Sequence, residues 1–129
     1  MADAPIALKD TRGPVLVVDD DADLVTAVTE SLIDEGIAAV GAHNSGSAVA
    51  AARRNPPSLV LLDFYLGEEN AADVVGKLRA ACGDLPIVLL SGTSAEDLPR
   101  LAGSLRLAGT LPKPCGLDVL VATVKRHRR

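Results

Sequence analysis

The sequence has very few aromatic residues: one Tyr, one Phe and no Trp among 129 residues. Because 48% of the residues are nonetheless hydrophobic, the predicted core consists mainly of Val, Leu, Ile and Ala side chains. The sequence also lacks any apolar run close to the ~20 residues that span a bilayer, and its beginning lacks the pattern of a secretory signal. These absences argue against a membrane protein and predict a cytoplasmic one.

An excess of basic residues is also absent. The chain has 13 Lys and Arg residues against 17 Asp and Glu, a net charge of −4, which argues against general nucleic-acid binding. Its two cysteines, Cys82 and Cys115, are far apart and form no ligand-spaced cluster with His43 or His127. This spacing argues against a metal–thiolate site, and both cysteines are predicted to be buried or half-buried apolar residues.

What the sequence does contain is a regular alternation of strand-like and helix-like segments. Five such β-α units predict an α/β fold with a parallel sheet covered by helices on both faces. Residues 1–13 are predicted to be a flexible leader, and residues 14–129 a single folded domain. A second strand is expected over residues 37–42. Helices are expected over residues 23–35, 45–54, from near Asn70 to Cys82, after Ser94 (short, because of Pro99 and Gly103), and around residues 117–124.

Four polar sites lie at the ends of apolar runs that are predicted to be buried strands. The carboxyl ends of parallel strands meet at one edge of a sheet, which is where open α/β sheets bind ligands. We therefore expect these polar side chains to gather in one crevice. The runs and their polar residues are residues 15–18 with Asp19 and Asp20, 59–62 with Asp63, 87–90 with Ser91, and 107–111 with Lys113.

The residue types at this edge suit phosphoryl chemistry. Asp19, Asp20 and Asp63 would repel one another, and a hard divalent cation relieves that repulsion. Magnesium fits because it prefers oxygen ligands and bridges carboxylates to phosphoryl oxygens. Asp63 can then act as a nucleophile that forms an acyl phosphate, while Ser91 and Lys113 bind the phosphoryl oxygens. Taken singly, each residue has an ordinary alternative: a helix N-cap for Asp20, a loop hydroxyl for Ser91, a surface charge for Lys113.

From Pro14 to about His127 the chain resembles a two-component response-regulator receiver domain. The spacing between its acidic, hydroxyl and lysine sites is typical of that family, and no G-x-G-x-x-G or Walker sequence supports the alternative of a nucleotide-binding enzyme. The resemblance implies a flavodoxin-like, doubly wound five-stranded sheet of order 2-1-3-4-5 with five helices. The matching motifs are residues 17–21, 61–63, 90–92 and 113–114.

The same resemblance implies a role for each site residue. Asp63 is the expected phosphoacceptor and a magnesium ligand, Asp20 a direct magnesium ligand, and Asp19 a ligand mainly through water. The family also uses the backbone carbonyl two residues after the phosphoacceptor, here that of Tyr65. Ser91 is expected to hydrogen-bond the phosphoryl group and Lys113 to pair with it, with a cis bond between Lys113 and Pro114.

A receiver takes its phosphoryl group from a phosphohistidine on a sensor histidine kinase or a histidine phosphotransfer protein. The chain is therefore expected to be a switch rather than an enzyme, although it takes part in its own phosphorylation and dephosphorylation. We expect a single-domain regulator, relay or phosphate sink that acts through a downstream protein, as a monomer or a phosphorylation-dependent dimer. The alternative is a degenerate receiver that works as a phosphorylation-independent protein-interaction module.

Two departures from the family pattern bear on output. The position three before Lys113, usually aromatic, is Thr110, so the usual aromatic relay is missing. Pro99 and Gly103 weaken the helix that normally forms part of the output face, which suggests a bistable segment there. Glu68 and Glu69, after the expected phosphoacceptor, are predicted to be a solvated loop, and His43 to be structural or exposed.

Overall fold

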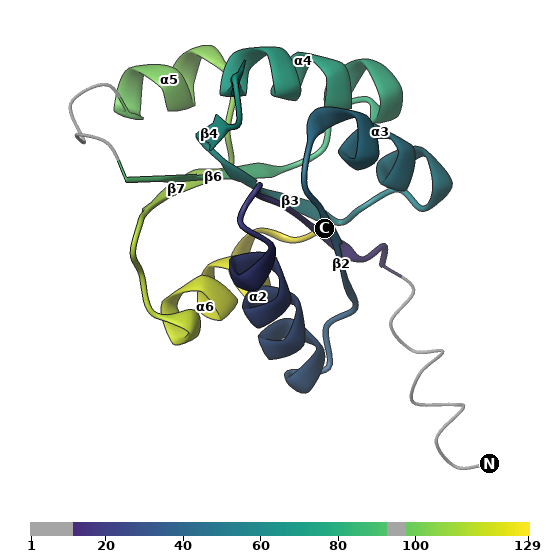
Figure 1. The fold of residues 1–129 in the computed structure, drawn as a ribbon, viewed down its shortest axis with the longest axis vertical. Coiled ribbons are helices and arrows are strands. Elements are labelled where there is room, and N and C mark those ends of the chain that lie inside the picture. The colour runs from purple at the N-terminus through teal and green to yellow at the C-terminus, as the bar shows by residue number, and fades with distance from the viewer. Residues whose placement is uncertain (1–11, 93–97) are drawn as a thin grey trace.

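The computed structural model describes residues 12–92 and 98–129, and these form one parallel five-stranded sheet with helices on both faces (Figure 1). The strand order is β2-β1-β3-β6-β7, so the predicted order, counted over the strands of this sheet, is confirmed. All four strand pairings are parallel. The strands are β1 (Val15–Val18), β2 (Ala39–Ala42), β3 (Leu59–Asp63), β6 (Ile87–Ser91) and β7 (Gly109–Pro112).

Two helical layers cover the sheet, as the alternation of the sequence predicts. Helices α3 (Ser45–Arg54), α4 (Ala71–Cys82) and α5 (Leu98–Ser104) lie on one face, and α2 (Ala22–Asp34) and α6 (Leu117–His127) on the other (Figure 1). Successive strand residues point to opposite faces. Leu16, Val18, Val60 and Leu62 therefore pack under α3 and α4, whereas Val15, Val17, Leu59 and Leu61 pack against α2 and α6.

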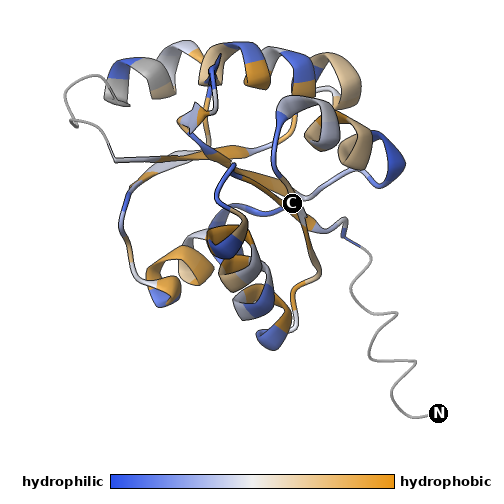
Figure 2. Ribbon diagram, in the orientation of Figure 1, coloured by the Kyte–Doolittle hydropathy of each residue, from blue (hydrophilic) through white to orange (hydrophobic). Residues whose placement is uncertain are grey.

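The central strands are the most apolar part of the chain (Figure 2). Every residue of β1, β3 and β6 is buried. A strand that is covered on both faces needs a continuous apolar sequence rather than an alternating one, which is why these runs could be recognised. Cys82 and Cys115 are free and half-buried, as predicted.

Helix boundaries follow local capping signals. The side chain of Asp21 accepts hydrogen bonds from the backbone N–H groups of Asp23 and Leu24 and so begins α2, within the predicted acidic segment. Asn44 and Ser47 form a reciprocal capping box at the start of α3. Asn70 caps α4, which confirms the predicted start. Helix α5 has only seven residues, as its Pro and Gly predict, and its expected first turn after Ser94 lies outside the described residues.

Two strands differ from the prediction. The second strand begins at Ala39 rather than residue 37, because the backbone N–H of Ile37 bonds to Leu32 and closes the end of α2 instead. The last strand covers Gly109–Pro112 rather than residues 107–111. Leu107 N–H bonds to the carbonyl of Ala102 and ends α5, so pairing with β6 starts only after it.

One element was not predicted. Between Asp63 and α4, strands β4 (Tyr65–Leu66) and β5 (Glu69–Asn70) form a short antiparallel hairpin. Gly67 in its turn has φ of +61°, a conformation that favours glycine. The hairpin thus follows the carboxyl end of β3 with only Phe64 between them.

The two ends of the folded part are hydrogen-bonded to the same residue, Ser58, at the edge of the sheet opposite the carboxyl ends of the strands. Ser58 N–H donates to the carbonyl of Pro14, and the carbonyl of Ser58 accepts from the backbone N–H of Arg129. The guanidinium of Arg129 also donates to the carbonyl of Asp84. Within residues 12–92 and 98–129, no helix combines the length and apolarity needed to cross a membrane. The predicted leader falls almost entirely outside the described residues.

Candidate functional site

Three carboxylates converge at the carboxyl edge of the sheet. Asp19 and Asp20 follow β1, and Asp63 ends β3, which is the neighbouring parallel strand. One carboxylate oxygen from each of the three lies within 4.8 Å of the others. Asp19 is 1% exposed and Asp63 is 7% exposed, while Asp20 is open to solvent. The parallel pairing of β1 with β3 is thus what brings residues 44 positions apart in sequence into one cluster.

Lys113 supplies a positive charge to this cluster. Its Nζ lies 3.1 Å from Oδ2 of Asp19 and 3.3 Å from Oδ1 of Asp63. The backbone N–H of Lys113 donates to the carbonyl of Ser91, which fixes the lysine just beyond the paired ends of β6 and β7. The bond between Lys113 and Pro114 is cis, as the resemblance implies.

The electrostatics of Asp63 reflect this crowding. Burial raises the pKa of its carboxyl group, and the nearby charge of Asp19 raises it further. The charge and hydrogen bond of Lys113, together with the backbone N–H of Tyr65, act in the opposite direction but do not compensate fully. Two acids that share one lysine therefore leave excess negative charge, which favours the binding of another cation.

Lys113 titrates outside the physiological range. Partial burial opposes its charge, but the hydrogen bond to Asp19, followed by the charges of Asp63 and Asp19, outweighs burial and raises the pKa of the ammonium group. Lys113 is therefore a permanent cation at neutral pH and a suitable partner for an anion that enters the site.

The remaining predicted residues lie at the same edge. Ser91 is 1% exposed and ends β6 beside β3 and β7. Tyr65 follows Asp63 by two positions, and its backbone N–H donates to the Asp63 carboxylate. The residue is 58% exposed, and its ring packs edge-on against Phe64. The role predicted for the hydroxyl of Ser91 and for the carbonyl of Tyr65 stays a prediction.

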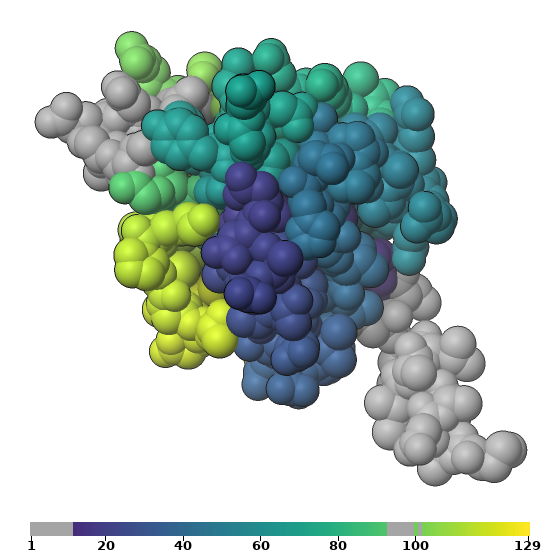
Figure 3. All heavy atoms as spheres, viewed as in Figure 1, coloured from purple at the N-terminus to yellow at the C-terminus, as the bar shows by residue number. Residues whose placement is uncertain are grey.

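The donor set fits magnesium. All three side chains offer carboxylate oxygens, the ligand type that hard divalent cations prefer, and one of them is exposed so that water can complete the coordination. Among the described residues this is the one group of three or more acidic, His or Cys side chains close enough to share an ion. In Figure 3 the purple segment after β1 is bordered by teal residues of the hairpin region and by yellow residues from the β7–α6 side.

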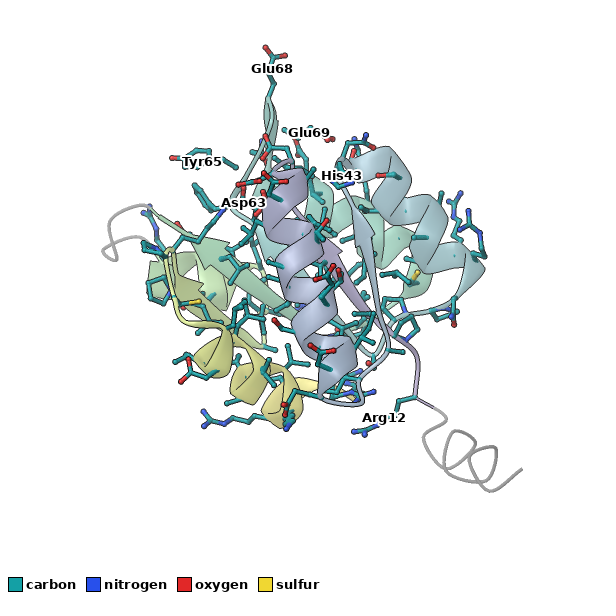
Figure 4. All side chains as sticks on the ribbon, turned by 60° about the horizontal axis from the view of Figure 1, so that its bottom comes forward. Arg12, His43, Asp63, Tyr65, Glu68 and Glu69 are labelled. Carbon is teal, nitrogen blue, oxygen red and sulfur yellow. The ribbon has the colours of Figure 1, made fainter. Side chains whose placement is uncertain are left out.

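The prediction of a solvated loop at residues 68–69 is half wrong. Glu68 projects into solvent at the tip of the hairpin, but Glu69 turns toward the start of α3 (Figure 4). There it accepts hydrogen bonds from Ser45 and pairs with Lys77. Nothing in the sequence spacing marks this contact, because it joins residues from three separate elements.

Two further neighbours of the site were missed. The backbone N–H of Gly67 donates to Oδ2 of Asp20, 3.2 Å away, so the hairpin turn touches the acidic cluster. His43, predicted to be structural or exposed, is exposed, and its Nδ1 lies 3.2 Å from the carbonyl oxygen of Asp19. In the sequence, Gly67 four residues after Asp63 was a signal for this turn, since glycine readily adopts the positive φ found here.

Comparison with known proteins agrees with these observations. The model of the family described as "Response regulator receiver domain" matches residues 15–125. Among curated relatives, "Probable transcriptional regulatory protein TcrX" of Mycobacterium tuberculosis is 42% identical over 113 residues, which cover 86% of this chain and 47% of that protein. "Alginate biosynthesis transcriptional regulatory protein AlgB" of Pseudomonas putida is 32% identical over 119 residues, covering 92% of this chain and 27% of that protein.

Solved structures show the same fold. The chemotaxis protein CheY4 of Vibrio cholerae superposes with a TM-score of 0.82 at 22% identity, covering 91% of this chain and 99% of that one. NtrX of Brucella abortus, crystallised with ATP, gives 0.81 at 28% identity, covering 91% of this chain but 27% of that one. The chain thus spans roughly a quarter to a half of the length of the curated relatives it matches.

Proposed function

This chain belongs to the response regulator receiver domain family, and from that membership we propose that it accepts a phosphoryl group on Asp63 within a two-component phosphorelay. One observation carries the proposal. The buried carboxylate of Asp63 has oxygens of Asp19 and Asp20 within 4.8 Å and the ammonium of Lys113 at 3.3 Å. A nucleophile, a set of hard-metal ligands and a fixed cation therefore lie together.

The donor is a phosphohistidine on a sensor histidine kinase or a histidine phosphotransfer protein. An oxygen of the Asp63 carboxylate forms the new O–P bond as the N–P bond to the imidazole breaks, and the imidazole nitrogen keeps the bonding electron pair and gains a proton from solvent. Asp20, Asp63, the Tyr65 carbonyl and, through water, Asp19 would hold magnesium, which would supply positive charge to neutralise the phosphoryl oxygens.

The chain's own cation and hydroxyl complete the site. Lys113 pairs with Asp19 and Asp63 before transfer. Afterwards it pairs with a phosphoryl oxygen, because the carboxyl group of phosphorylated Asp63 is uncharged and the phosphoryl oxygens carry the negative charge. Ser91 donates its hydroxyl hydrogen to another phosphoryl oxygen from the end of the neighbouring strand. The change in partners at these two residues is the event that a downstream protein detects.

The proposal also sets the context in which the chain works. We place it in the cytoplasm, with a histidine-containing phosphodonor on one side and a protein target on the other. Direct nucleic-acid binding by these residues is not part of the proposal, since the net charge is −4.

Intact mass spectrometry tests this function. The protein is incubated with acetyl phosphate, a small donor, with magnesium or with EDTA. We expect one phosphoryl group on the wild type in magnesium, and none in EDTA or on Asp63→Asn. Asp84→Asn, the same change at an exposed aspartate away from the site, is the matched control and should be modified like the wild type.

The opposite result has a defined meaning. If the wild type gains no phosphoryl group under fast sampling and does not bind beryllofluoride, the proposal fails. The chain is then a receiver-shaped interaction module that works without phosphorylation.

A further inference from the structure

The hairpin beside the site is too short to hold its own position. Strands β4 and β5 have two residues each, and an isolated two-stranded hairpin is at best marginally stable in water. Its turn is attached to the acidic cluster by a single bond, from the N–H of Gly67 to Oδ2 of Asp20. Since that bond is solvent-exposed, the hairpin also depends on the packing of the buried Leu66 side chain and on a second polar attachment.

Glu69 provides the second attachment. Its Oε1 accepts from the backbone N–H of Ser45 at 3.1 Å, and its Oε2 accepts from the hydroxyl of the same residue. Ser45 is 7% exposed and is the first residue of α3, so the carboxylate lies at the positive end of that helix dipole. Lys77 of α4 adds an ammonium group 3.4 Å from Oε2.

The charge state of Glu69 agrees with this arrangement. The hydrogen bond from the Ser45 hydroxyl, then that from its backbone N–H, and finally the charge of Lys77 lower the pKa of the carboxyl group. Glu69 is therefore ionised whenever the protein is near neutral pH, and all three partners are donors.

Backbone pairing carries this attachment to the metal ligands. Glu69 on β5 is paired with Leu66 on β4, and the next residue back along β4 is Tyr65. The N–H of Tyr65 donates to the carboxylate of Asp63, and its carbonyl is a proposed metal ligand. Fixing Glu69 against α3 therefore fixes the hairpin backbone at both Asp63 and Asp20.

We infer that Glu69, through its bonds to Ser45 and Lys77, is a positioning residue that preorganises the hairpin for magnesium. The inference rests on the proposed function, since it concerns the same metal site. Partners that orient metal ligands from outside the coordination sphere typically change metal affinity ten- to a hundredfold when removed. Figure 4 shows the geometry on which this depends: Glu69 directed at the helix, Glu68 away from it.

Glu68 provides a matched control for a substitution of Glu69. It is the adjacent residue, carries the same charge and is exposed. Glu69→Gln and Glu68→Gln therefore remove the same charge from neighbouring positions of the hairpin, but only the first breaks the attachment to α3. A general loss of negative charge would weaken magnesium binding in both variants.

Calorimetric titration with magnesium chloride is the main measurement. We expect Glu69→Gln to raise the magnesium Kd about tenfold and Glu68→Gln to change it less than twofold. Ser45→Ala keeps both glutamates and removes one donor, so it should raise the Kd by an intermediate factor. This variant also carries the test if Glu69→Gln does not fold.

Two readouts separate positioning from general stability. Tyr65 is the only tyrosine of a chain without tryptophan, so its fluorescence anisotropy reports the hairpin alone; it should fall in metal-free Glu69→Gln and stay unchanged in Glu68→Gln. The magnesium concentration that gives half of the maximal rate of phosphorylation by acetyl phosphate should be higher in Glu69→Gln than in the wild type. The maximal rate at saturating magnesium should be the same, because the reacting groups are intact.

The outcomes distinguish the two proposals. If the wild type binds no magnesium, the proposed function fails and the inference falls with it. If the wild type binds magnesium but Glu69→Gln and Glu68→Gln have the same Kd, the function stands and the positioning role is overturned. A Ser45→Ala variant with wild-type Kd beside a weakened Glu69→Gln would likewise overturn the assigned contact.

Discussion

The two halves of the acidic site are held in different ways. Asp19, Asp63 and Ser91 are nearly inaccessible to solvent and follow or end strands that are buried on both faces. The hairpin from Tyr65 to Asn70 is mostly exposed, and apart from the buried Leu66 side chain it is held by a few hydrogen bonds and one ion pair. The first half can change only if the sheet changes, whereas the second can rearrange while the rest stays folded. The buried residues of the proposed phosphorylation site are thus rigidly placed, whereas the hairpin beside the proposed metal site can adjust locally.

The largest expected effect comes from removing Lys113, the cation that pairs with Asp19 and Asp63 in the first, rigid half of the site. In metal-free buffer, Lys113→Met leaves the carboxylates of Asp19 and Asp63 side by side without compensation. Breaking a buried ion pair costs about 3–5 kcal/mol, and since Lys113 is partly exposed we expect a loss of about 2 kcal/mol in the free energy of unfolding. Urea denaturation measures it.

The matched control is Lys125→Met. Its Nζ lies 2.8 Å from Oε1 of Glu35, but both side chains are about half exposed, so the denaturation midpoint should hardly move. Equal losses in the two variants would show that the acidic cluster is no more rigidly coupled to folding than a surface ion pair.

A smaller effect of opposite sign is expected for Asp63→Asn. Burial, and then the charge of Asp19, raise the folded-state pKa of Asp63 above its unfolded value. The folded protein therefore binds this proton more tightly, and the free energy of unfolding falls as pH rises through the folded-state pKa. At pH 7 without metal, Asp63→Asn should therefore be more stable than the wild type.

The pH dependence of that difference is its check. Below the ordinary aspartate pKa of about 3.9, Asp63 is protonated in both the folded and the unfolded wild type, so the wild type and Asp63→Asn should have similar free energies of unfolding. Thermal unfolding across this pH range, with Asp84→Asn as the control, measures it. A metal-free Asp63→Asn protein that is less stable than the wild type at pH 7 would contradict the assigned electrostatics.

The smallest expected effect compares two glycines with the same backbone strain. Gly67 has φ of +61° and Gly36, which follows α2, has φ of +80°; an added Cβ meets no atom within 4 Å at either. Alanine in this conformation costs about 1 kcal/mol. Gly36→Ala should show that loss, but Gly67→Ala should show less than half of it, since the hairpin can relax locally.

Magnesium binding should be affected in the opposite order, more by Gly67→Ala than by Gly36→Ala. Gly67→Ala disturbs the turn that touches Asp20, so its Kd should rise, while Gly36→Ala should bind like the wild type. Equal losses in unfolding free energy would show that the hairpin is as firmly integrated as the end of α2.

Much of the rigid half was predictable. Strands covered on both faces require uninterrupted apolar residues, so β1, β3 and β6 were visible as runs such as Leu59–Leu62. Parallel strands put their carboxyl ends at one edge, so the polar residue after each run had to join the others. That reasoning correctly placed Asp19, Asp63, Ser91 and Lys113.

The adjustable half was not predictable for the same physical reason that makes it adjustable. Two-residue strands leave no periodic pattern, and the contact of Glu69 with Ser45 depends on how α3 packs beside α4 rather than on local sequence. The predicted starts of two strands were wrong because the backbone N–H groups of Ile37 and Leu107 bond to the end of the preceding helix instead of to a neighbouring strand. Single sequences carry little information about which of two short-range bonds will form.

The bonds of Ser58 have a topological consequence. Its N–H reaches Pro14 and its carbonyl is reached by Arg129, so the entry and exit of the folded part meet at one residue, on the edge of the sheet opposite the carboxylates. A short peptide could join the two ends into a circle, and new ends could be opened in an exposed loop, without touching the acidic edge. The same closeness lets the domain be inserted into a host loop as a closed unit.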